Sequence, residues 1–235
     1  IKLFFLLLFT SKFIQFYFQN MSQALLEEYI ETDNAIKLIS LLDEQPHLCT
    51  LKTSQNVSPI MLSSYYGKNE IAEILFRYAP SITIFEAIAL RKLDFISETL
   101  DLNPTIIDAV SEDGFSPLYL STYFGNEEST HLLLLKGADP NIPSNNEYLI
   151  YPLHTAVSTN FTMIAKMLIE GGADCNVVQL SGASPLHLAA KNGNIDLLIV
   201  LLEAGANVNA KMDDGKSPAD LAYENGFNEI SKILS

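Results

Sequence analysis

The chain has 235 residues, of which 48% are hydrophobic and 18% are charged, and its formal net charge is -14. This acidity argues against nucleic acid as a partner, because nucleic acids are held chiefly through Lys and Arg contacts to phosphates. Two cysteines, Cys49 and Cys175, are too few for a disulfide framework, so free thiols in a reducing compartment are expected.

Residues 1–20 form an apolar segment with an apolar run over residues 3–9, then Lys12 and an aromatic-rich run over residues 13–18. A signal peptide should end in a small-x-small cleavage site, and a membrane span needs about 20 apolar residues. The segment fits both patterns poorly. We therefore interpret it as untranslated sequence before a start at Met21, outside the fold, with an export signal or membrane anchor as the alternatives. A membrane partner is expected only if these residues are translated.

A seven-residue phrase, Ser-Pro-Leu-His-Leu-Ala-Ala at residues 184–190, recurs in weaker form along residues 21–235. From Pro117 the prolines of the phrase follow at steps of 35, 33 and 33 residues, whereas Pro59 stands 58 residues earlier. The long gap holds one more unit, in which Ile84 takes the place of the proline, and Ala24 takes it in a weak first copy. Seven units are predicted, starting near residues 23, 58, 83, 116, 151, 184 and 217.

Each unit predicts two short helices. The serine before the proline can cap the first helix, and the proline itself suits the first helical position. These capping serines are Ser58, Ser116, Ser184 and Ser217. Eight residues after the proline, a glycine or Asn160 can take the left-handed conformation that ends a helix. A second apolar helix follows, as in residues 163–169 and 195–202. Because helices this short cannot bury such faces alone, the pairs are expected to stack.

The phrase, the 33-residue step and the endings at residues 137–141, 172–176 and 205–209 resemble the ankyrin repeat family. The resemblance covers Ser22 to Ser235, with atypical outer units as caps. It implies an all-α solenoid of stacked antiparallel helix pairs with short β-hairpin fingers, in one elongated domain over residues 21–235. It also implies a protein-interaction module, either an adaptor, scaffold or inhibitor, or alternatively a secreted or membrane-tethered effector.

One finger is expected to be missing. The step from Pro59 to Ile84 is only 25 residues, so residues 79–83 are too few to hold both a helix exit and a hairpin. A notch in the row of fingers is therefore predicted between the second and third units.

Candidates for catalytic or metal chemistry are few. His154 and His187 hold the fourth place of the phrase, where the resemblance implies a hydrogen bond from the imidazole to backbone of an adjacent loop. The chain has no His-x-x-x-His, no Cys-x-x-Cys and no phosphate-binding loop, and its serines lack a nucleophile-elbow context. We therefore predict no enzyme, no cofactor and no metal site.

The resemblance places partner contacts on the two residues before the turn glycine and on the finger tips. At these positions the second to fourth units carry aromatic residues, a Leu and an Arg, whereas later units carry polar ones. The predicted partner-binding residues are Tyr65, Tyr66, Leu90, Arg91, Phe115, Tyr123, Phe124, Tyr148, Ile150 and Tyr151. The alternative is that several of them pack internally, since neighbours on a helix diverge by about 100°.

The expected partner is an unidentified protein that is basic or apolar at the contact, because the chain is acidic and its candidate surface is aromatic. The chain is expected to be a monomer in the cytoplasm. A secreted or membrane-anchored location is the alternative.

Overall fold

The computed structural model describes residues 20–145 and 147–235. The apolar segment predicted over residues 1–20 lies outside the described residues except for Asn20. Helices joined by turns and loops make up the described part, which contains no β-strand. The predicted all-α fold class is therefore confirmed.

The chain divides into two compact units, residues 1–90 and 91–235. The boundary lies between Leu90 and Arg91, inside the third predicted repeat. The single repeat domain over residues 21–235 stays a prediction, and each unit is described by itself below.

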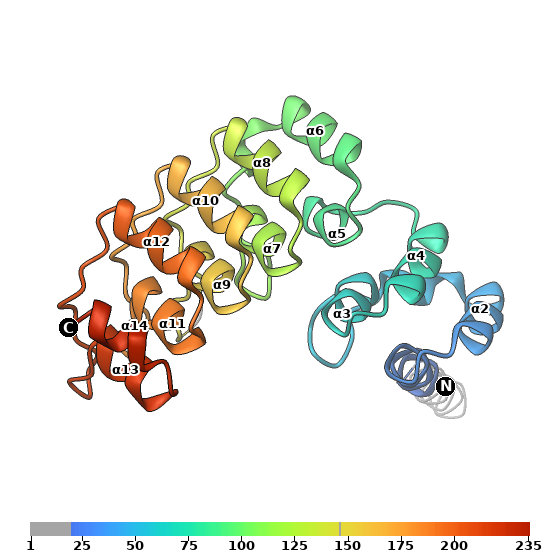
Figure 1. The fold of residues 1–235 in the computed structure, drawn as a ribbon. Helices are drawn as coiled ribbons and strands as arrows, with labels where there is room; N and C mark the ends of the chain where they lie inside the picture. The colour runs from blue at the N-terminus through green and yellow to red at the C-terminus, as the bar shows by residue number, and fades with distance from the viewer. Residues whose placement is uncertain (1–19, 146) are drawn as a thin grey trace, which may run out of the picture. The chain divides into compact units, whose positions relative to one another are not determined.

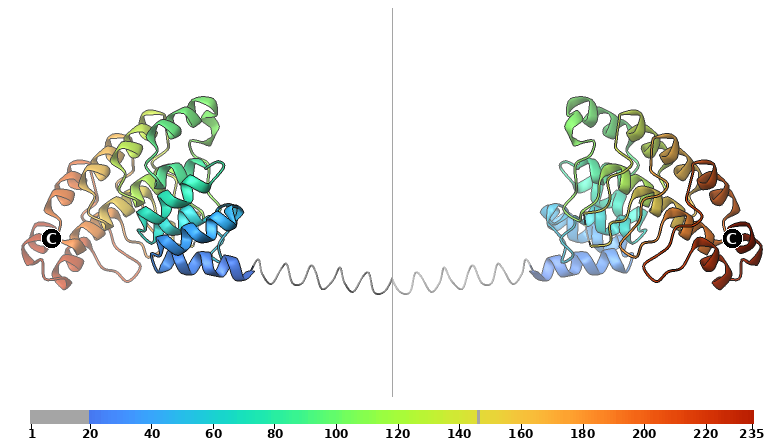
Figure 2. Two further views of the ribbon diagram at one scale, coloured as in Figure 1. Left: turned by 90° about the vertical axis from the view of Figure 1, so that its right-hand side faces the viewer. Right: turned by 90° about the vertical axis from the view of Figure 1, so that its left-hand side faces the viewer.

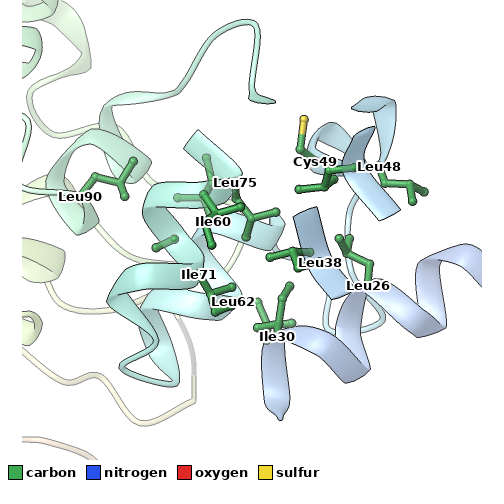
Figure 3. Close-up of a cluster of buried hydrophobic side chains, with 13 residues drawn as sticks. Leu26, Ile30, Leu38, Leu48, Cys49, Ile60, Leu62, Ile71, Leu75 and Leu90 are labelled. Carbon is green, nitrogen blue, oxygen red and sulfur yellow. The ribbon is translucent and has the colours of Figure 1, made fainter. Parts of the chain in front are cut away.

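The first unit packs its helices around an apolar core. Leu26 and Ile30 of the first helix gather with Leu38, Ile60 and Leu62 (Figure 3), and all five side chains are fully buried or nearly so. Burial of a Leu or Ile side chain contributes about 1.5–3 kcal/mol. The elements of this unit are a helix over residues 20–31, α2 (Ala35–Glu44), the 3-10 helix η1 (Pro46–Thr50), α3 (Pro59–Tyr65), α4 (Asn69–Tyr78) and α5 (Ile84–Ala89).

The link between α4 and α5 contains no hairpin, as expected from the 25-residue step. Residues 79–83 run directly from one helix to the next. A reciprocal cap then starts α5, because the Thr83 hydroxyl accepts a hydrogen bond from the Glu86 N–H while the Glu86 carboxylate accepts one from the Thr83 N–H at 2.7 Å. This cap fixes the start of α5 without the Ser-Pro pair found elsewhere.

The second unit stacks helix pairs in two rows (Figures 1 and 2), and the chain runs in order along the stack from green to red. Neighbouring helices contact one another along each row. One row is α7 (Pro117–Tyr123), α9 (Pro152–Ser158), α11 (Pro185–Asn192) and α13 (Pro218–Glu224). The other is α6 (Leu93–Leu102), α8 (Glu127–Leu135), α10 (Thr162–Glu170) and α12 (Ile195–Glu203); the 3-10 helix η2 (Pro104–Ile106) follows α6, and α14 (Asn228–Ile233) packs on α13.

Asparagine side chains set the spacing between successive loops of this stack. The Asn141 side chain donates to the Gly172 carbonyl at 3.0 Å and accepts from the Asp174 N–H at 2.8 Å. Asn176 repeats both bonds one step later, to the Gly205 carbonyl and from the Asn207 N–H. Each bond contributes about 1 kcal/mol, and together they hold the repeats in register.

Candidate functional site

The aromatic pair at the end of α7 shows how the helix places two neighbouring rings. Tyr123 is the last residue of α7, Phe124 caps it, and Gly125 then takes a left-handed conformation with φ of 60°. The two rings meet edge to face with centroids 5.3 Å apart. Tyr123 is exposed and Phe124 is half-buried. The pair thus offers one exposed aromatic side chain, with the second ring packed beside it.

Arg91 occupies the left-handed turn position that glycine holds in most other repeats, with φ of 57°. The helix before it, α5, has six residues where α3, α7 and α9 have seven, so the turn comes one position earlier than the eight-residue rule predicts. The exposed guanidinium donates from Nη2 to the Phe124 carbonyl oxygen at 2.8 Å. Arg91 therefore ties its own turn to the end of α7.

Leu90 lies in the first unit and is 8% exposed, within the apolar core cluster of that unit. The same one-residue shift explains this burial, because Leu90 caps α5 instead of standing two positions before the turn. Leu90 therefore packs internally and adds nothing to an exposed surface.

Tyr65 and Tyr66, also in the first unit, end α3. Tyr65 is half-buried and Tyr66 is exposed. The Tyr66 hydroxyl accepts a hydrogen bond from the Gln55 side chain at 2.6 Å. Tyr66 therefore supports the nearby loop as well as presenting a ring to solvent.

Four loops of the second unit, which precede α7, α9, α11 and α13, form its fingers. In three of them the first residue donates its N–H to the carbonyl of the fifth, and the fourth residue is a glycine with positive φ. Tight turns of this kind replace the predicted β-hairpins, since no strand flanks them. We call residues 111–115, 144–145 with 147–150, 179–183 and 212–216 the finger row.

Phe115, the last residue of the first finger, points inward. Its ring stacks on Tyr119 of α7 at a centroid distance of 4.5 Å and an interplanar angle of 12°. The ring is half-buried. The residue after the turn glycine is buried in the third finger, at Ala183, whereas in the fourth finger it is the half-buried Lys216. The stacking of Phe115 on Tyr119 does not agree with the expectation that Phe115 faces the tip of the finger.

The second finger is two residues longer and is closed by hydrogen bonds between Ser144 and Ile150. The Ser144 N–H donates to the Ile150 carbonyl at 2.8 Å, and the Ile150 N–H donates to the Ser144 hydroxyl at 3.0 Å. Tyr148 and Leu149 are exposed at its tip, whereas Ile150 and Tyr151 are half-buried. Leu149 takes the left-handed position, with φ of 51°.

Leu180 of the third finger was missed by the sequence reasoning. It is 61% exposed, and its N–H donates to the Tyr148 carbonyl at 3.2 Å, so the second and third fingers lie side by side. The signal was available: Leu180 stands two residues before the turn glycine Gly182, and this position points outward in each five-residue finger of the row.

His154 and His187 take the roles that the resemblance implies. Each Nε2 faces a backbone carbonyl oxygen of the next finger, Ala183 at 2.9 Å and Lys216 at 3.2 Å. Burial lowers the pKa of His154 from 6.5 to about 4 and also lowers the pKa of His187. Both rings are thus neutral near pH 7 and hold fingers in place.

Among the described residues, no group of three or more His, Cys, Asp or Glu side chains is arranged to hold a metal ion. No helix in that part of the chain combines the length and apolar character needed to cross a membrane.

Comparison with protein families matches residues 153–235 to three copies of the ankyrin repeat and residues 113–145 to a further ankyrin repeat. The matched residues contain α7 to α14 except Pro152 of α9, and they include most of the finger row, although residues 147–150 lie between the two matches. No curated protein matches the chain. Helix pairs in two stacked rows, turn glycines and the imidazole bonds between fingers agree with this match, and the chain belongs to the ankyrin repeat family.

Proposed function

We propose that this chain is an adaptor, scaffold or inhibitor that binds a partner protein through the second unit. Ankyrin repeats are generally protein-protein interaction modules and are typically non-enzymatic. The observation that carries the proposal is a set of large apolar side chains that are exposed at the end of α7 and on the finger row. It is formed by Tyr123 at the end of α7 and by Tyr148, Leu149 and Leu180 of the finger row.

Aromatic side chains are enriched among residues that dominate binding energy, because they bury a large area with little loss of conformational entropy. Contiguous exposed apolar patches are uncommon on soluble monomers and often have a binding function. Tyr123 and Tyr148 are exposed aromatic residues, and Tyr148 stands beside the exposed Leu149 on a finger that is bonded to that of Leu180, whereas Phe115 and Leu90 pack internally. Of the ten partner-binding residues that the sequence suggested, the proposed surface therefore keeps Tyr123 and Tyr148, and it adds Leu149 and Leu180.

Substitution of Tyr123 by Ser, with Tyr223→Ser as the matched control, tests the proposal. Both tyrosines are exposed on the second unit, at the ends of α7 and α13. Immobilised full-length chain should capture partner from native extract when wild type or Tyr223→Ser is used, and Tyr123→Ser should capture much less at an unchanged melting temperature. Equal capture by both variants, or a steep fall in the melting temperature of Tyr123→Ser, would count against this surface.

We also propose that the chain is a monomer and that it is cytoplasmic, and its two free cysteines support the reducing compartment. Cys49 and Cys175 are buried, each thiol donates to a backbone carbonyl, and burial raises the pKa of both. Unoxidised buried thiols agree with a reducing compartment. Light scattering of the purified chain tests the monomer. Recovery of a native N-terminal peptide that starts before Met21, together with membrane or extracellular fractionation, would favour the secreted or tethered alternative.

A further inference from the structure

The finger row is continuous because each finger hydrogen-bonds to the next through backbone. The Asn145 N–H donates to the Gly114 carbonyl at 2.7 Å, the Leu180 N–H to the Tyr148 carbonyl at 3.2 Å, and the Asp213 N–H to the Ser181 carbonyl at 3.1 Å. Side chains at equivalent places on successive fingers are therefore neighbours. What stands at these places decides what the row can bind.

The tips of the two central fingers are apolar. Tyr148 is 59% exposed, Leu149 is 45% exposed, and Leu180 is exposed on the adjacent finger. These are large side chains held on short loops whose backbones are fixed by the bonds just described. They form one apolar centre, contributed by two fingers, that a partner side chain can cover.

Acidic residues flank this centre on both sides. The positions equivalent to Leu180 are Glu112 in the first finger and Asp213 in the fourth, and each is followed by a second acid, Asp113 or Asp214. Glu147 adds a further carboxylate beside Tyr148. An extended segment lying along the row would thus meet carboxylates at both ends and apolar side chains in the middle.

Basic residues on the finger row do not offset this charge. The first three fingers contain no Lys or Arg, and the fourth contains only Lys216, with Lys211 just before it. The Lys216 ammonium lies 2.9 Å from a Glu224 carboxylate oxygen on α13 and 3.6 Å from one of Asp214 in its own finger. The Lys211 ammonium lies 3.5 Å from a carboxylate oxygen of Asp220 on α13. The row therefore carries five acidic side chains and one basic side chain, and this net negative charge attracts a basic partner.

The second finger keeps features that weaken its own repeat. Leu149 adopts a left-handed backbone that glycine takes in the other fingers of the row. Tyr151 stands where other units have the capping serine and gives α9 no side-chain cap, and Nδ1 of buried His154 has no hydrogen-bond partner. Unfavourable local choices of this kind gather at functional sites, where binding outweighs local stability. This observation is independent of exposure and charge, and it concerns the second finger and the start of α9 that follows it.

We infer that the finger row binds a peptide segment of a partner protein that has one or two large apolar side chains in its centre and Lys or Arg on both flanks. This inference rests on the proposed function and adds the chemistry of the partner. The apolar centre would be covered by the partner's apolar side chains, and the flanking bases would face Glu112 and Asp213. Because the flanking pairs are exposed to solvent, binding should weaken as salt is raised.

Selection of short random peptides displayed on phage against the immobilised full-length chain tests the inference without a known partner. Enriched peptides should share an apolar centre with basic flanks. Their affinity, measured by fluorescence polarisation, should fall about tenfold or more for Tyr148→Ser/Leu180→Ser and severalfold for Glu112→Gln/Asp213→Asn. The matched control is Leu135→Ser, because Leu135 is as exposed as the tip residues but lies at the end of α8. It should leave the affinity unchanged.

Three results would overturn the inference, and they separate it from the proposed function. Enriched peptides without basic flanks, or peptides unaffected by the finger variants but lost with Tyr123→Ser, would refute the inference and leave the proposed function standing. Absence of any enriched peptide on chain that is folded by circular dichroism, together with absence of partner capture from extract, would count against both.

Discussion

The Nε2 atom of His154 lies 2.9 Å from the carbonyl oxygen of Ala183, across the gap between two successive repeats. A carbonyl oxygen only accepts, so Nε2 carries the proton and Nδ1 presents a lone pair. That Nδ1 atom is buried without a donor, whereas Nδ1 of His187, one repeat later, lies within 3.1 Å of the Ser184 N–H and hydroxyl. The two histidines therefore make the same inter-repeat hydrogen bond through Nε2, but only His187 also has a hydrogen-bond partner at Nδ1.

The stability of the chain should fall as the pH drops from about 6.5 towards 4, because of His154. Its pKa is about 4 in the folded chain and near 6.5 when unfolded, so the unfolded state binds more protons between these values. The contribution is fully present above pH 6.5, is lost progressively as the pH falls, and levels off below 4. The full depression corresponds to about 3 kcal/mol, and about 2 kcal/mol should be lost by pH 5.

Urea unfolding of the wild type and of His154→Asn at pH 7 and pH 5 measures this effect. The variant should be less stable at both pH values, because it loses the bond to Ala183, but its difference in unfolding free energy between pH 7 and pH 5 should be much smaller than that of the wild type. His187 has a pKa lowered in the same direction and supplies the remaining dependence. An undiminished difference in His154→Asn would mean that burial of this ring is not the cause.

Tyr151→Ser should stabilise the second unit by about 1 kcal/mol. A serine there can cap α9, which now lacks a side-chain cap, and can donate to Nδ1 of His154 as Ser184 does to His187. Loss of the half-buried tyrosine ring offsets part of the gain. Chemical denaturation gives the change, and the same substitution in a His154→Gln background should gain less. An equal gain in both backgrounds would show that the imidazole is not involved.

The fold could be predicted from the sequence because each repeat specifies its own helices locally. Ser116 and Ser217 cap their helices as expected, with the following proline at the first turn, and Gly125 and Gly226 follow these helices in the left-handed conformation. These signals act within a few residues, so they survive in a single sequence. Repetition of the signals then predicts the stacking.

The candidate site could be predicted only in part, because exposure depends on register. One residue fewer in α5 moves the left-handed turn to Arg91 and carries Leu90 into the core, and a periodicity counted from proline does not reveal that shift. Phe115 was placed at a tip by position, yet it stacks on Tyr119, a contact that no local pattern encodes. Exposure of Leu180 could have been predicted from its place two residues before Gly182. The prediction instead used the residue after the glycine, which packs internally in the first and third fingers.

Truncation of Leu133 should destabilise the second unit strongly, whereas truncation of Leu135 should have little effect. Both lie on α8, but Leu133 is fully buried and Leu135 is 72% exposed. Leu133→Ala should cost about 2–5 kcal/mol through lost burial and the cavity left behind. Leu135→Ala should stay within about 0.5 kcal/mol. Urea unfolding measures both, and similar losses would contradict the packing of α8 between its neighbours.

Gly193→Ala should destabilise the chain far more than Gly67→Ala, although both glycines have φ of 68°. The shared backbone conformation costs an alanine about 1–2 kcal/mol at either site, so that strain cancels in the comparison. A Cβ on Gly193 would lie 2.3 Å from a ring carbon of Phe227, whereas a Cβ on Gly67 would meet nothing within 4 Å. Displacing the ring should add about 1–3 kcal/mol at Gly193.

The ring of Phe227 provides the control for this comparison. In a Phe227→Ala background the additional cost of Gly193→Ala should vanish, since the two changes share one contact and are not additive. Gly125 meets Phe161 of the following repeat in the same way, with the added Cβ 2.8 Å from the ring. Gly125 and Gly193 thus serve close approach of the next repeat as well as backbone geometry. Equal losses at Gly193 and Gly67 in urea unfolding would show that backbone conformation alone explains them.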